Sequence, residues 1–148
     1  MCNAHAAVRH LLRGLLEETQ VVTVVDMEAG LEHLSRGTGR HVDTLLVVME
    51  PYYKALETAR RCAELGRELG IPRILAVANK LRGEEDRGAV RQYAAAHGLQ
   101  LAGEVPFDAA LQQADQRGTA PELAPGSAAA ARAIDSLTAA LKLSEARP

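Results

Sequence analysis

The sequence predicts an α/β fold built on a parallel sheet. Short apolar runs rich in Val, Ile and Leu alternate with segments in which apolar residues recur every three or four positions. The runs are apolar throughout, as in strands that are buried on both faces of a parallel sheet. Such alternation is typical of right-handed βαβ units. About four strands are expected: Val21–Val25, Leu45–Met49, Ile74–Ala78 and Leu99–Val105.

The segments between these runs have helical periodicity. Gly70 and Pro72 end the longest of them, because glycine closes a helix and proline cannot continue it. Asp108 is expected to cap the N-terminus of a short helix that runs to Gln116. The other expected helices are Asn3–Glu18, Tyr53–Leu69, Glu84–His97 and Ser127–Leu143. Residues 1–143 therefore form the expected domain, with a frayed tail at 144–148.

Composition excludes several classes of protein. The 148 residues suit one domain, and a net charge of −2 gives no broad basic surface for nucleic acid. Two cysteines make no disulfide framework, which favours a reducing compartment. The first residues lack a secretory pattern, and no apolar run is long enough to span a membrane. We expect a cytoplasmic domain that binds neither nucleic acid nor membranes.

An acid follows the first expected strand. Asp26 stands at its carboxyl end, the edge at which α/β proteins bind ligands, and Gly30 lies four residues later. In nucleoside-triphosphate hydrolases, such an acid holds magnesium and such a glycine approaches the terminal phosphate. The same two residues also fit a simple turn, in which Asp26 caps the backbone and Gly30 supplies the angle. The pattern alone leaves both interpretations open.

Asn79 and Lys80 close the third expected strand at the same edge. An asparagine amide can make paired hydrogen bonds to the edge of a base, and the lysine stem can cover the ring. Guanine-specific proteins need an acid two residues after this lysine, and here that residue is Arg82. The sequence therefore favours adenine over guanine. The alternative is a polar strand end without a special function.

A phosphate-binding loop is missing from the sequence. Such a loop needs a glycine-rich turn followed by lysine and a hydroxyl residue. The lysines are Lys54, Lys80 and Lys142; none follows a glycine, and none precedes Ser or Thr. Because this loop provides most of the positioning in phosphoryl transfer, the chain as written is not expected to hydrolyse ATP.

Cys2 is the candidate metal ligand. Together with His5 it has the spacing to bind one metal ion at the start of a helix. Zinc prefers four ligands, so a partner chain would have to complete the site. The alternative is that a cysteine so close to the terminus is incidental.

Taken together, these residues resemble the MinD/ParA superfamily of deviant P-loop ATPases. More closely, they are similar to the CooC-type accessory ATPases that mature nickel carbon monoxide dehydrogenase. The resemblance covers nearly the whole chain, and its motifs occur in the family's order. These motifs are Asp26–His33 with its continuation through Thr38, Glu50-Pro51, Ala78–Lys80 and Val105–Asp108.

The resemblance implies an incomplete three-layer parallel sheet of the P-loop NTPase type. The family's P-loop strand, its phosphate loop and its first switch would all precede this sequence. In the family fold, the missing strand lies between those expected at Val21–Val25 and Leu45–Met49. The chain is then either the C-terminal part of a longer ATPase, with its start assigned at a methionine inside that protein, or a native short form.

The resemblance also implies roles for single residues. Asp26 would hold Mg²⁺ through water, and Gly30 would approach the terminal phosphate of ATP. Asn79 would meet adenine beside Lys80, with Pro106 and Phe107 near the base.

A metal site at a dimer interface is a further implication. CooC-type proteins carry a Cys-x-Cys pair there; Cys2 matches the second cysteine, Met1 takes the intervening position, and the first cysteine is missing. The family thus implies a homodimer, nickel or zinc at the interface, and carbon monoxide dehydrogenase or another metalloenzyme as client.

Three functions follow from these residues. The leading one is part of a CooC-like accessory ATPase for ATP-dependent nickel insertion. The second is a non-catalytic interaction module that kept the fold and lost the nucleotide. A MinD- or ParA-like positioning ATPase is the third; it is weakened because the last expected helix carries only Arg132 and Lys142 as cations, too few for a membrane-binding helix.

Overall fold

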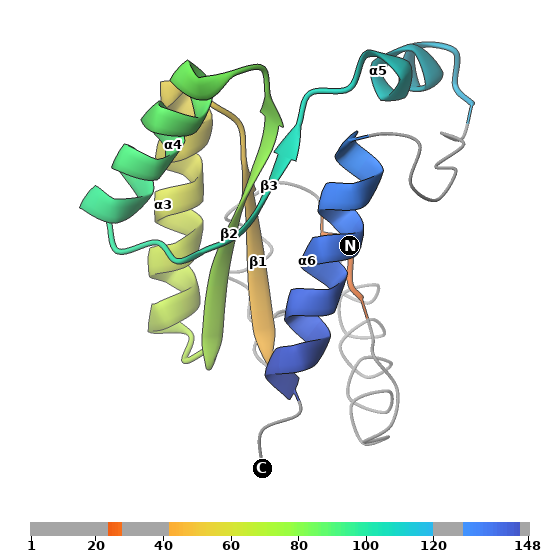
Figure 1. The fold of residues 1–148 in the computed structure, drawn as a ribbon. Coiled ribbons are helices and arrows are strands. Elements are labelled where there is room, and N and C mark those ends of the chain that lie inside the picture. Colours follow the sequence, from red (N-terminus) through yellow and green to blue (C-terminus); the bar gives the residue numbers. More distant parts are fainter. Residues whose placement is uncertain (1–23, 28–41, 120–128, 146–148) are drawn as a thin grey trace, which may run out of the picture. The chain divides into compact units, whose positions relative to one another are not determined.

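The computed structural model describes residues 24–27, 42–119 and 129–145 (Figure 1). The chain divides into two compact units, Met1–Leu45 with Arg61–Ile74 and Leu46–Arg60 with Leu75–Pro148. The helix expected at Asn3–Glu18 lies outside the described residues. In the described part of the chain, no helix has both the length and the apolar character needed to cross a membrane.

The described strands form one sheet in the order β1-β2-β3. Their bounds are Thr44–Met49 for β1, Arg73–Leu81 for β2 and Leu101–Pro106 for β3. Strands β2 and β3 are parallel, with Ala76 opposite Leu101 and Leu81 opposite Pro106. The expected parallel sheet is confirmed. Strand β2 runs three residues beyond the expected end at Ala78 and includes Asn79 and Lys80.

The helices follow the predicted pattern closely. Their bounds are Tyr53–Glu68 for α3, Glu84–Ala96 for α4, Ala109–Gln116 for α5 and Ala129–Glu145 for α6. Helix α3 ends where Gly70 adopts a positive φ of 76°, and the N–H of Ile71 donates to the carbonyl of Gly66. Helix α6 continues to Glu145, two residues beyond the expected end at Leu143.

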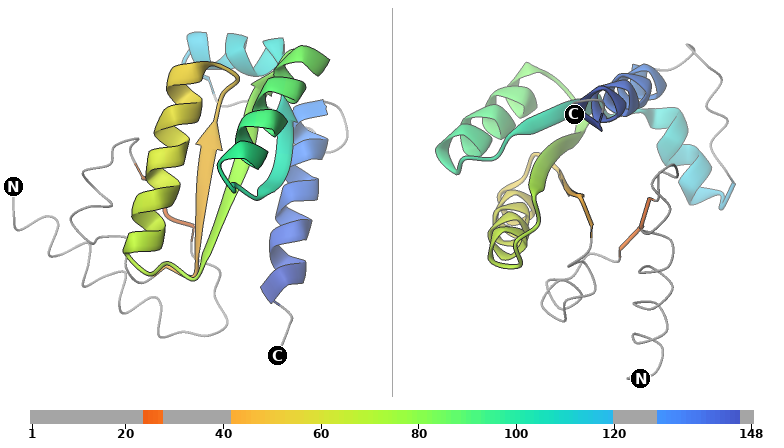
Figure 2. Two further views of the ribbon diagram at one scale, coloured as in Figure 1. Left: turned by 90° about the vertical axis from the view of Figure 1, so that its left-hand side faces the viewer. Right: turned by 90° about the horizontal axis from the view of Figure 1, so that it is seen from below.

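Adjacent residues of β3 show which helix covers each face of the sheet. Glu104 forms an ion pair with Arg91 of α4, whereas Gly103 packs against Leu137 of α6. Because successive strand residues point to opposite faces, α4 and α6 lie on opposite sides of β3 (Figure 2). The unit formed by Leu46–Arg60 and Leu75–Pro148 therefore has three layers, helix, sheet and helix.

Apolar residues fill the layer beneath α6. Val77, Val105 and Ala130 are buried there. Ala102, Leu111, Ala133 and Leu137 pack around them. On the other face, the hydroxyl of Tyr93 in α4 donates to Glu57 of α3 over 2.9 Å and joins these two helices. The core contains few large side chains. Helices and strands therefore approach one another closely, and small side chains fill the interior that aromatic rings fill in other proteins.

The predicted burial of the first two strands is wrong in part. Val47 and Met49 are buried, but Leu46 is 37% exposed and Val48 is 60% exposed. Val24 and Val25 are not in a strand, and Val24 is 87% exposed. An apolar run shows that a segment tolerates burial on both faces, but neighbouring elements decide whether both are covered. No described element buries the Leu46 and Val48 face.

Gly66 provides a test of this packing. A Cβ atom at Gly66 would lie 2.8 Å from Cδ2 of Leu45 and 3.1 Å from Cδ1 of Ile74, whereas none of the described residues approaches Gly88 of α4 within 4 Å. Gly66→Ala gains helix propensity but must displace the methyl ends of Leu45 and Ile74, so the overpacking should cancel that gain and leave the free energy of unfolding about unchanged or slightly lower. Gly88→Ala, the matched control, should raise it by about 0.5–1 kcal/mol through helix propensity. Urea unfolding measures both, and equal effects would contradict the close packing.

Candidate functional site

The candidate site lies where the three strands end. Glu50 follows β1, Asn79 and Lys80 come just before Leu81, the last residue of β2, and Phe107 follows β3. The N–H of Phe107 donates to the carbonyl of Leu81 over 2.9 Å, which continues the β2–β3 pairing beyond the last strand residue. The carboxyl ends of parallel strands form the edge at which α/β proteins bind ligands. The structure thus brings together the predicted residues of β2 and β3.

Lys80 gives this edge an unusual backbone. Its φ is +57°, the only positive φ of a non-glycine residue among those described. A left-handed residue with a Cβ is uncommon and costs of the order of 1 kcal/mol, so local bonds must support it. The Lys80 N–H donates to Oδ1 of Asn79 over 3.0 Å. The Asn79 carbonyl oxygen is thus fixed, and its amide nitrogen makes no hydrogen bond to a described residue.

An ion pair joins the ends of β1 and β2. Nζ of Lys80 lies 2.7 Å from Oε1 of Glu50, with the two side chains 56% and 31% exposed. The hydrogen bond to Glu50 and the charge of its carboxylate raise the pKa of Lys80. Exposed pairs of this kind contribute only about 0–1 kcal/mol to stability, so the pair acts chiefly by fixing where the lysine stem lies.

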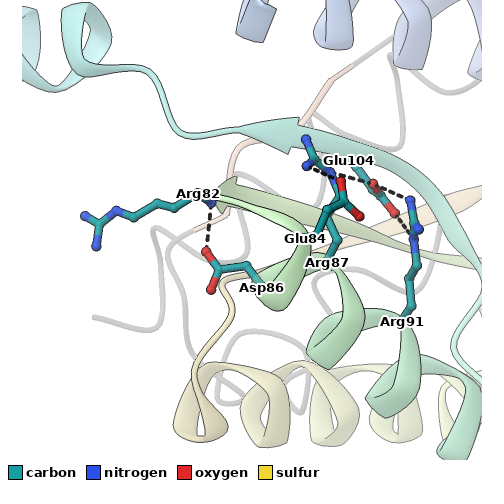
Figure 3. Close-up of polar contacts among 6 residues, drawn as sticks. All are labelled: Arg82, Glu84, Asp86, Arg87, Arg91 and Glu104. Carbon is teal, nitrogen blue, oxygen red and sulfur yellow. Dashed lines mark hydrogen bonds and ion pairs between the residues drawn. The ribbon is translucent and has the colours of Figure 1, made fainter.

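Arg82 covers the aromatic ring at the end of β3. Its Cζ atom lies 4.6 Å from the centroid of the Phe107 ring, a cation–π contact worth about 0.5–1 kcal/mol at an exposed position. The backbone N–H of Arg82 donates to Oδ2 of Asp86 over 2.7 Å. Figure 3 shows the Arg82 side chain extending away from that bond. Backbone and side chain are therefore held by different partners.

Ion pairs connect helix α4 to β3 (Figure 3). Both nitrogens of the Arg91 fork bond the Glu104 carboxylate, at 2.6 and 3.0 Å, and Arg87 lies 3.5 Å from the same group. Arg87 also pairs with Glu84 in the first turn of α4 at 2.9 Å. A bidentate arginine–carboxylate pair fixes the orientation of the two side chains as well as the distance between them. These ion pairs hold the start of α4, and with it the residues that follow β2.

Asp108 has a structural task. Its Oδ1 accepts from the backbone nitrogens of Ala110 and Leu111, at 2.8 and 3.4 Å. This confirms the predicted cap of α5. The carboxylate satisfies the free N–H groups of the first turn and sets the direction in which the chain leaves Phe107.

The remaining predicted site residues are Asp26, Gly30 and Cys2. Asp26 is described and is exposed, and it belongs to the other compact unit. Gly30 and Cys2 lie outside the described residues. Among residues 24–27, 42–119 and 129–145, no three His, Cys, Asp or Glu side chains gather as metal ligands would.

The sequence analysis did not predict two side-chain contacts at this edge, that of Glu50 with Lys80 and that of Arg82 with Phe107. Glu50 was recognised only as the end of a strand, because nothing in the spacing pairs it with a lysine thirty positions later. Arg82 was recognised as the residue that replaces an acid, and its position over Phe107 depends on the β2–β3 pairing. Pro106 pairs with Leu81 at this edge, and its place near the base stays a prediction.

Comparisons with known proteins give sequence relatives. No family model matches the chain. It is 44% identical over 118 residues to the carbon monoxide dehydrogenase accessory protein CooC of Rhodospirillum rubrum, a match that covers 80% of this chain and 44% of CooC. An uncharacterised ATP-binding protein of Methanocaldococcus jannaschii is 39% identical over 73% of this chain and 42% of its own length. The chain thus spans less than half the length of these relatives.

Solved structures give the fold. The MinD cell division protein of Aquifex aeolicus matches with a TM-score of 0.76 and 19% identity, over 97% of this chain and 62% of that one. The cell division ATPase MinD of Pyrococcus furiosus matches with a TM-score of 0.71 and 18% identity, over 92% and 57%. At this identity the likeness concerns the fold alone.

Fold and sequence together define the class. The chain has a MinD-like P-loop NTPase fold, incomplete relative to the solved structures. Its sequence relatives make it a CooC-like protein of the MinD/ParA type.

The Glu50–Lys80 ion pair leads to a prediction about the pKa of Lys80. Glu50→Gln removes the carboxylate charge, so the pKa of Lys80 should fall back toward its ordinary value of 10.5. Because the folded-state pKa is the raised one, the contribution of the pair is complete below about 10.5 and is lost as pH rises through the raised value. NMR signals of the Lys80 side chain, followed through alkaline pH, measure the shift.

The control for this titration is Glu85→Gln, which removes the same charge from an exposed position in the first turn of α4. It should leave the Lys80 pKa where the wild-type chain has it. An unchanged pKa in Glu50→Gln would contradict the ion pair.

Proposed function

We propose that the chain is the switch and base-binding part of a CooC-like accessory ATPase. The observation that carries the proposal is the convergence of Asn79, Lys80 and Phe107 at one sheet edge. The similarity to CooC, and the ATP-binding descriptions of the other relatives, support the same function. In the whole protein, binding and hydrolysis of ATP would drive nickel insertion into carbon monoxide dehydrogenase.

The residues at the edge fit a purine base. The Asn79 amide nitrogen can donate to a ring acceptor, while its oxygen, already bonded to the Lys80 N–H, retains a second lone pair. The Lys80 stem and the Phe107 ring supply apolar surfaces for a flat ring. Pro106 removes one backbone donor beside them. These groups would bind and orient the base of ATP.

The phosphates would be bound elsewhere. No lysine of the chain has the sequence context of a phosphate-binding loop, so this edge alone provides no cradle for them. We propose that a segment outside this sequence supplies the loop, with Asp26 holding Mg²⁺ through water and Gly30 approaching the terminal phosphate. Without that segment, the chain should bind the base weakly and leave ATP intact.

The metal cargo and the partners extend this proposal. Cys2 would bind nickel or zinc together with ligands of a second copy, which makes a homodimer the expected assembly. The client would be carbon monoxide dehydrogenase or another metalloenzyme, as the description of the related CooC suggests.

A second function is favoured by one observation. Leu46 and Val48 leave an apolar face of β1 exposed in the described structure, and such faces mark contact surfaces. A non-catalytic interaction module with this fold would use that face and would need no nucleotide.

Adenosine monophosphate separates the two functions. Titration into the ¹⁵N-labelled chain should shift the NMR signals of Asn79, Lys80 and Phe107 at high ligand concentration. Magnesium-ATP should bind no more than about tenfold tighter, since the phosphates find no loop. Asn79→Ala should weaken binding of the monophosphate about tenfold, the effect of one lost hydrogen bond in the site.

The matched control is Gln113→Ala, which removes an amide from the exposed face of α5. It should leave the affinity unchanged. Absence of any shift with the monophosphate would refute the base site and leave the interaction module. Tight binding or hydrolysis of ATP by this chain alone would refute the need for an additional phosphate-binding segment.

A further inference from the structure

We propose that the guanidinium of Arg82 is a displaceable cover on the Phe107 ring, an autoinhibitory contact that a base must break before it can stack there. The inference rests on the proposed base-binding function and adds a regulation of that same site. It is carried by the contact of Arg82 with the ring, by the exposure of the two side chains and by the weak attachment of the guanidinium.

The guanidinium occupies the space that a stacked base needs. The Cζ atom of Arg82 lies 4.6 Å from the centroid of the Phe107 ring. A flat base on the same face would place its atoms about 3.5–4 Å from the ring carbons, the ordinary contact distance between such atoms. The guanidinium and a base therefore cannot both lie directly on this face of the ring.

The covered face is the one that a ligand would reach. Phe107 is half-buried in the described structure, whereas Arg82 is exposed. The side of the ring under the exposed guanidinium is therefore the side toward solvent. The ring cannot easily turn away with its backbone, because the Phe107 N–H donates to the carbonyl of Leu81 over 2.9 Å. Arg82 is thus the group that has to move.

The guanidinium is held weakly enough to move. The backbone N–H of Arg82 is bound to Asp86, a bond that does not involve the side chain. No described carboxylate or carbonyl accepts a hydrogen bond from the guanidinium, so its contact with the ring is what positions it. Arg91, by contrast, is bound by both carboxylate oxygens of Glu104. An exposed cation–π contact changes an equilibrium by a factor of only about two to five, which a ligand can overcome.

Adenosine tests the cover without any attraction between a phosphate and Arg82. In an NMR titration, Arg82→Ala should bind adenosine about two- to fivefold more tightly than the wild-type chain, because the cost of displacing the guanidinium is removed. The alanine variant keeps the backbone N–H that bonds Asp86. Arg117→Ala removes an exposed arginine at the end of α5 and, as the matched control, should keep the wild-type affinity.

A second measurement uses the wild-type chain and needs no variant. The Nε–H signal of Arg82 should be shifted upfield in the free chain, because the guanidinium lies over the face of an aromatic ring. Saturation with adenosine should remove this shift, since the guanidinium then leaves the Phe107 ring.

The outcomes separate this inference from the proposed function. If adenosine binds to neither the wild-type chain nor Arg82→Ala, the base site is refuted and the cover with it. If adenosine binds but Arg82→Ala has an equal or lower affinity, the cover alone is refuted. A lower affinity would make the guanidinium a stacking surface for the base, as arginine planes can be. An upfield shift of Arg82 that persists in the complex would also overturn the cover.

Discussion

The parallel pairing of β2 with β3 is the constraint on which the candidate site depends. Ala76 lies opposite Leu101 and Leu81 opposite Pro106, and the Phe107 N–H extends the pairing to the Leu81 carbonyl. A shift of this register by one residue would turn the side chains to the other face of the sheet. The aromatic ring stands beside the end of β2 because the ladder of backbone bonds fixes it there.

Ion pairs then position the side chains at this edge of the sheet, because the core beside it is made of small residues. Glu104, between Arg91 and Arg87, holds α4 against β3, and Glu50 holds Lys80. Such exposed pairs contribute little to stability, so their value lies in geometry. They fix the direction of side chains at the end of the strands, where the backbone of Lys80 already departs from the ordinary strand conformation.

Periodicity predicted the helices well because their ends carry local chemical signals. Asp108 caps α5, and Gly70 closes α3, as each residue type favours. The burial of apolar strands was predicted poorly. Val48 is exposed although its neighbours in sequence are apolar, because the exposure of a strand residue depends on which elements lie against that face of the strand. Val24 is exposed as well, and it does not lie in a strand.

The sequence by itself determined the alternation of strands and helices, the polar residues at the strand ends and the replacement of an acid by Arg82. These are local properties, read from residue type and spacing. Only the tertiary structure decided that Glu50 meets Lys80 and that Arg82 covers Phe107. Both contacts join residues that are distant in the chain, and they arise because parallel strands bring their carboxyl ends to one edge.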